Sequence, residues 1–158
     1  MTQGFLAFFI AAAVFVGLVG FCVLSIAHII LARIQSRLIR LIILILGMGV
    51  PMIFLIQIDT LMMIDAALAL AVPFAVLFPP HCFPQYIGGP AGFWRSVQCY
   101  VVILIVGIVT PFLFYGHPWI FWHTPLSNGL IFVCLMLGNI GLATVVYRGF
   151  DKWKGVPE

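Results

Sequence analysis

The sequence predicts an all-α integral membrane protein, a bundle of about five transmembrane helices in one domain over residues 1–158. Hydrophobic residues make up 65% of the chain and charged residues only 7%, whereas soluble proteins carry about a quarter charged residues. The mean hydropathy is +1.27. Several long runs contain no charge, and the longest covers residues 96–147.

The helix boundaries follow from these runs and their interruptions. The first helix is predicted over residues 5–32. The run 41–78 is too long for one crossing, which needs about 20 residues, and Asp59 and Thr60 within it are good N-cap residues. The segment 115–128, "YGHPWIFWHTPLSN", divides the last run. The remaining helices are therefore predicted over 39–57, 60–78, 98–115 and 127–147.

Prolines shape two predictions about the helices and the loop between the third and fourth of them. Pro51, Pro73 and Pro111 lie inside predicted helices and are expected to kink them. Residues 79–97 are expected to form an apolar loop at the membrane interface or under a partner protein, because four prolines oppose a regular helix. These prolines are Pro79, Pro80, Pro84 and Pro90.

Charge placement predicts the topology. With five helices, all seven Lys and Arg residues fall on one side of the membrane. Because basic residues collect on the cytoplasmic side, the N-terminus is predicted outside and the C-terminus in the cytoplasm. The expected location is a bacterial inner membrane, although an organelle membrane would obey the same rule.

Several side chains are predicted to lie at the lipid headgroups. Arg33, Arg37 and Arg40 have the spacing of one helix face and are expected to bind an anionic leaflet, with partner docking as an alternative. Tryptophans commonly occupy the membrane interface, and four are assigned to it: Trp94, Trp119, Trp122 and Trp153.

Two carboxylates are candidates for proton or ion binding. A carboxylate in hydrocarbon is costly and often marks a pathway or a partner contact, which singles out Asp65, five residues after Thr60. Asp59 would stand at the mouth of such a path. The alternatives are an N-cap role for Asp59 and a hydrated carboxyl between helices for Asp65.

Two histidines are candidates for binding haem or quinone. His28 and His81 map near the same side, and two imidazoles on different helices can hold a b-type haem. However, His28 lies near a helix end and His81 in the predicted loop, so interfacial histidines without a ligand are the alternative. No metal site is predicted, and the expectation is that the protein binds no cofactor.

Small residues indicate places where helices approach closely. Ala13 and Gly17 are four apart in the first helix. Gly138 and Gly141 flank Asn139 in the last, and the Asn139 amide is expected to bridge two helices.

The function expected from these observations is that of a small non-catalytic subunit of a larger cytoplasmic-membrane complex, packing against other membrane subunits and lipids. Familiar enzyme signatures are absent from the sequence, and its +3 charge is what positive-inside placement produces, so nucleic acid is not an expected partner. One alternative is a proton- or ion-coupled transport component using Asp65, as a homo-oligomer. A second is a haem- or quinone-associated anchor of a respiratory-type complex.

Overall fold

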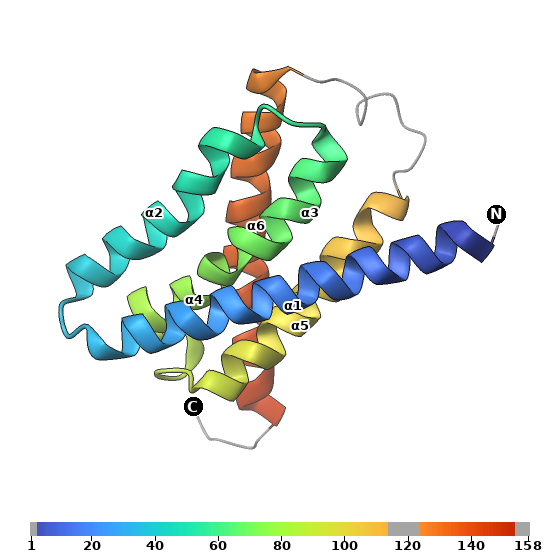
Figure 1. Cartoon of the computed structure of the whole chain (residues 1–158). Helices are drawn as coiled ribbons and strands as arrows, with labels where there is room; N and C mark the ends of the chain where they lie inside the picture. Colours follow the sequence, from blue (N-terminus) through green and yellow to red (C-terminus); the bar gives the residue numbers. More distant parts are fainter. Residues whose placement is uncertain (1–2, 114–123, 154–158) are drawn as a thin grey trace.

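The computed structural model describes residues 3–113 and 124–153, and the side chains of 3–9, 61, 110–113 and 151–153 lie outside that description. The described residues are mostly helical, without a strand in these ranges (Figure 1). In chain order its elements are α1 (Gln3–Arg33), α2 (Arg37–Leu55), α3 (Thr60–Leu70), α4 (Val72–Cys82), the 3-10 helix η1 (Pro84–Ile87), α5 (Phe93–Leu113) and α6 (Pro125–Trp153).

Helix length and composition agree with the predicted membrane bundle. Among the described residues, four stretches are long and apolar enough to cross a membrane: Ile10–Arg33, Arg37–Leu55, Met62–Cys82 and Pro125–Phe150. α5 contributes a shorter apolar stretch, Phe93–Val109. The third stretch combines α3 and α4, so the fold provides four or five helical passes of the kind that the sequence predicts.

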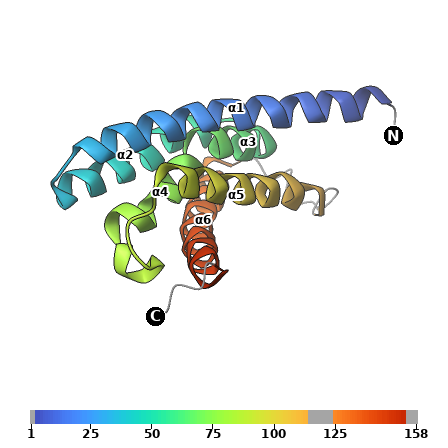
Figure 2. The same ribbon diagram turned by 90° about the horizontal axis from the view of Figure 1, so that it is seen from below.

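The combined α3–α4 pass forms the centre of the bundle. In its most apolar part 61% of the residues are buried, against 17% in α1, 11% in α2 and 22% in α6. Figure 2 shows α1 passing across one side of α4 while α6 extends from the other. The fully buried residues include Leu68, Val72 and Val76. The core therefore lies along α3–α4, and the other helices cover it.

The α3–α4 pass is interrupted at Ala71, two residues before Pro73, as expected for a proline that cannot donate a helical hydrogen bond. The last turn of a helix leaves carbonyl groups without helical partners. In α3 one of these carbonyl groups finds its partner on another helix, because the Tyr100 hydroxyl of α5 donates to the Leu68 carbonyl oxygen at 3.0 Å.

A second tyrosine supports the prolines inside α4. Pro80 has no N–H to donate to the carbonyl of Val76, four residues earlier. The Tyr147 hydroxyl of α6 donates to that carbonyl at 3.3 Å and lies 3.2 Å from the Ser96 Oγ. α4 therefore continues through Pro79 and Pro80 to Cys82.

These features correct two predicted boundaries. The helix predicted over 60–78 is two helices with a break at Ala71, and the second extends to Cys82. The loop predicted over 79–97 is correspondingly short, because α5 already begins at Phe93 and η1 occupies part of the interval. Gly88 and Gly89 make its sharp turn with positive φ values of 75° and 119°.

Three glycines bring the helices close together. A Cβ added at Gly20 of α1 would overlap the Tyr100 hydroxyl, and one at Gly47 of α2 would overlap the ring of Phe74. At Gly107 of α5 the added Cβ would lie 2.5 Å from a methyl carbon of Leu68. The close contacts made by small residues thus surround the central pass.

Candidate functional site

The five arginines gather at one end of the bundle. The His28 ring of α1 lies 5.5 Å from the Phe93 ring at the start of α5, and Arg95 Nη2 donates to the Tyr147 carbonyl near the end of α6 at 3.2 Å. The end of α1, the starts of α2 and α5 and the end of α6 are therefore neighbours. They carry Arg33, Arg37, Arg40, Arg95 and Arg148. We call this region the basic end.

His28 and His81 lie side by side at the basic end. Their ring centroids are 5.8 Å apart, with the ring planes inclined by 62°. Nδ1 of His28 and Nε2 of His81 are buried and have no hydrogen-bond partner among the described residues. His81 belongs to the last turn of α4 rather than to a loop. Because an unpaired buried polar atom costs free energy, the pair is suited to holding a water molecule or a ligand oxygen.

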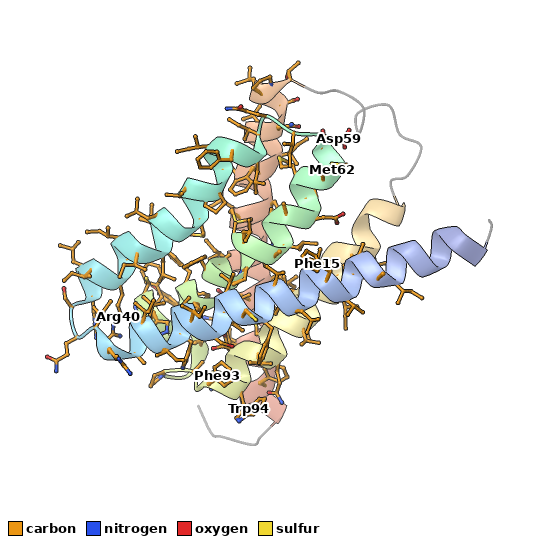
Figure 3. All side chains as sticks on the ribbon, viewed as in Figure 1. Phe15, Arg40, Asp59, Met62, Phe93 and Trp94 are labelled. Atoms are coloured by element: carbon orange, nitrogen blue, oxygen red, sulfur yellow. The ribbon has the colours of Figure 1, made fainter. Side chains whose placement is uncertain are left out.

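Arg40 fixes the turn between α1 and α2. Its Nε donates to the Ile34 carbonyl at 2.6 Å and its Nη2 to the Gln35 carbonyl at 3.5 Å. The guanidinium is close enough to interact electrostatically with His81 and Cys82. Figure 3 shows Arg40 beside this turn. One arginine therefore connects the α1–α2 turn with the histidine pair.

The donor set at the basic end fits an acceptor oxygen better than a cation. The described residues include no group of three or more His, Cys, Asp or Glu side chains placed to hold a metal ion. Two imidazoles could serve as axial haem ligands, but Phe93 packs against His28 and the positive charge of Arg40 acts on His81. Both neighbours make the pair a poor haem site.

An open apolar groove lies between α1 and α2. It has a volume of about 630 Å³, and α3 and α4 contribute its floor. Ile26 and Ile30 of α1, Leu46 and Val50 of α2 and Phe74 of α4 are among its lining residues. We call it the α1–α2 groove. Such a surface can take up a hydrocarbon chain.

The two candidate carboxylates lie away from the histidines. Asp59 immediately precedes α3, and its carbonyl accepts the Met63 amide at 2.8 Å, which marks the first turn of the helix. Figure 3 places Asp59 at the opposite end of the molecule from Arg40. Asp65 is exposed on α3 and forms no hydrogen bond or ion pair with the described residues. The structure does not join these carboxylates to the basic end.

The small residues singled out in the sequence have different surroundings. Ala13 is half-buried, and a Cβ at Gly17 would lie 3.1 Å from Leu104 of α5. Gly138 and Gly141 are exposed on α6, with nothing within 4 Å of an added Cβ. The Asn139 amide donates to the Leu135 carbonyl of its own helix at 2.8 Å, and no bond from it to another helix is made within the described residues.

The tryptophans predicted at the headgroups are described only in part. Trp94 is 72% exposed at the basic end, beside Phe93 (Figure 3). Trp119 and Trp122 lie outside the described residues, as does the side chain of Trp153.

Asn128 is the interhelical amide that sequence reasoning missed. Its side-chain nitrogen donates to the carbonyls of Ile56 at 3.1 Å and Ile58 at 2.9 Å, and its oxygen accepts the Thr60 hydroxyl at 2.9 Å. The α2–α3 turn is thus held by α6. The available signal was an amide in the first turn of an apolar helix, opposite a turn whose carbonyls need partners.

The arrangement as a whole offers hydrogen-bond donors and positive charge at one end and an apolar groove alongside. Comparison of the chain with known protein families, with curated proteins and with solved structures finds no match.

Proposed function

We propose that this chain is a small non-catalytic subunit of a larger assembly in the cytoplasmic membrane, with its N-terminus outside and its C-terminus in the cytoplasm. Its role would be to pack against other membrane subunits, to shield lipid or a cofactor, and to support assembly. The orientation rests on the five arginines at one end, because basic residues favour the cytoplasmic side.

The observation that carries the proposal is the length and exposure of α1. Its 31 residues correspond to about 46 Å, whereas the hydrocarbon core is roughly 30 Å thick. Figures 1 and 2 show its N-terminal part extending beyond the other helices. Nearer the middle of α1, Val14, Phe15 and Leu18 are exposed. A neighbouring subunit would cover these exposed side chains.

The exposed backbone of α6 supports the same proposal. Gly138 and Gly141 leave open space on the outer surface of the helix. Small residues allow another helix to approach closely, which is a common mode of association in membranes.

Native mass spectrometry of the tagged protein, extracted from its host in a mild detergent, would test the proposal. We expect foreign subunits in fixed stoichiometry. A photo-crosslinking residue at Phe15 should then capture a foreign subunit, while one at Ile53, an exposed position on α2, serves as the matched control. A homo-oligomer or a monomer with no foreign crosslink would refute the subunit role.

A cofactor-associated membrane anchor is the second candidate, and the juxtaposition of His28 and His81 favours it. The two unpaired imidazole nitrogens could donate to or accept from a quinone-type head group. Protein purified from its host should then release quinone on extraction. His81→Ala should abolish that signal, and a wild-type sample that releases no quinone would exclude this candidate.

A further inference from the structure

We propose that the α1–α2 groove binds one anionic phospholipid, with an acyl chain in the groove and the phosphate at the guanidinium groups of Arg33, Arg37 and Arg40. This site goes beyond the proposed subunit role and does not depend on it, because a solitary protein could bind the same lipid.

The groove has the chemistry of a hydrocarbon site. The residues that line it are apolar, and α1 contributes Ile26 and Ile30 while α2 contributes Leu46 and Val50. Its volume of about 630 Å³ lies within the range of roughly 300–1,000 Å³ typical of small-molecule sites. A polar molecule would gain no hydrogen bond along these walls, so the part of the ligand held here is aliphatic.

The two walls lead to arginines at the basic end. On α1, Arg33 follows the lining residue Ile30 by three positions, and on α2, Arg40 precedes the lining residue Ile43 by three positions. Residues three apart on a helix lie on the same face. Each apolar stripe therefore ends in a guanidinium, the group that binds phosphate best.

Arg40 is held in place before any ligand arrives. Its bonds to the Ile34 and Gln35 carbonyls use Nε and Nη2, and no hydrogen bond of Nη1 is made to the described residues. Arg33 and Arg37 are exposed on either side of the same turn. A phosphate at this position would meet one fixed and two adaptable guanidinium groups.

The shape of the groove favours a lipid chain over a partner helix. α1 and α2 are joined by residues 34–36 and diverge from that turn, so the two backbones are closest at the end that carries the arginines (Figure 1). A helix with its side chains is about 10–12 Å wide. An acyl chain attached to a phosphate head group matches both the apolar groove and the charge at this end.

The test measures lipid retention by native mass spectrometry on the purified protein. Phosphatidylglycerol and phosphatidylcholine with identical acyl chains are added at increasing concentrations. We expect one phosphatidylglycerol to remain bound preferentially. A basic residue near the membrane surface contributes about fivefold to anionic lipid binding, so Arg33→Gln with Arg37→Gln should weaken retention roughly 25-fold. Arg33→Lys with Arg37→Lys should preserve most of it.

A second variant pair tests the groove itself. Leu46→Trp fills the groove, whereas Ile45→Trp places the same side chain at an exposed position of α2 that does not line it. We expect only Leu46→Trp to reduce phosphatidylglycerol retention. Equal retention of the two lipids, equal retention by both tryptophan variants, or unchanged retention after removal of both arginines would each overturn the proposal. Displacement of the lipid by a co-purifying helix in the groove would overturn it as well.

Discussion

The hydroxyl of Tyr147 donates to the carbonyl oxygen of Val76 at 3.3 Å, across 71 positions of the sequence. Val76 lies four residues before Pro80, whose nitrogen cannot donate. Hydrocarbon offers no water to replace the missing donor, so a carbonyl left open there is costly. One tyrosine on α6 therefore supports the proline-containing last turns of α4.

Tyr147→Phe should lower the free energy of unfolding by about 1–2 kcal/mol, because the Val76 carbonyl and the Ser96 hydroxyl both lose a partner. Pro80→Ala restores an amide N–H that can bond Val76 within the helix. The loss caused by Tyr147→Phe should therefore be smaller in the Pro80→Ala background. Unfolding in mixed micelles measures this double-mutant cycle, and strictly additive effects would contradict the explanation.

Gly20→Ala should destabilise the bundle by about 1–3 kcal/mol, since the added Cβ would overlap the Tyr100 hydroxyl. Gly49→Ala is the matched control, because an added Cβ there meets nothing within 4 Å. The melting temperature of each variant in detergent gives the comparison. If both substitutions had the same effect, the close approach of α1 to α5 would not be the cause.

Asn128→Leu should cost more stability than Asn139→Leu. Asn128 holds the carbonyls of Ile56 and Ile58 in a turn between two other helices, whereas the Asn139 amide donates within its own helix. We expect about 1–3 kcal/mol for Asn128→Leu and increased protease sensitivity at residues 56–59. Equal losses from both variants would count against the role assigned to Asn128.

Asp65→Asn should leave stability unchanged or raise it, because Asp65 is exposed and has no ion-pair partner among the described residues. A neutral amide is less costly than a carboxylate at membrane depth. Thermal unfolding of the two proteins measures this effect. Reconstituted liposomes address the transport alternative, for which proton or ion flux should be present in the wild type and lost in Asp65→Asn.

Much of the fold follows from hydropathy and proline alone. Uncharged runs located four of the five predicted helices to within about six residues at each end, and Pro73 lies two residues after the break that divides the other one. Pro79 and Pro80 were misread as helix breakers, because the hydroxyl that makes them tolerable belongs to Tyr147. Local sequence patterns around Pro79 and Pro80 do not reveal this donor, because Tyr147 lies 71 positions after Val76.

The candidate site was predicted less completely. The charge pattern placed His28 and His81 near the same side, but their separation depends on how α1 and α4 pack. The α1–α2 groove also arises from packing, since its two walls read in the sequence as ordinary apolar helices. Asn128 was missed because two of its partners are backbone carbonyls, which residue identity does not reveal, and the third, the Thr60 hydroxyl, is 68 positions away in the sequence.

The two tyrosine supports of the central pass also set an order for its maturation. α3 and α4 are synthesised before Tyr100 of α5 and Tyr147 of α6. Until α5 and α6 have been synthesised, the carbonyls of Leu68 and Val76 lack the tyrosine hydroxyls that bond them in the finished bundle. The hydrogen bonds of the central pass are therefore completed by the C-terminal helices. In a nascent chain halted before α6, the Val76 carbonyl of α4 would lack the Tyr147 hydroxyl.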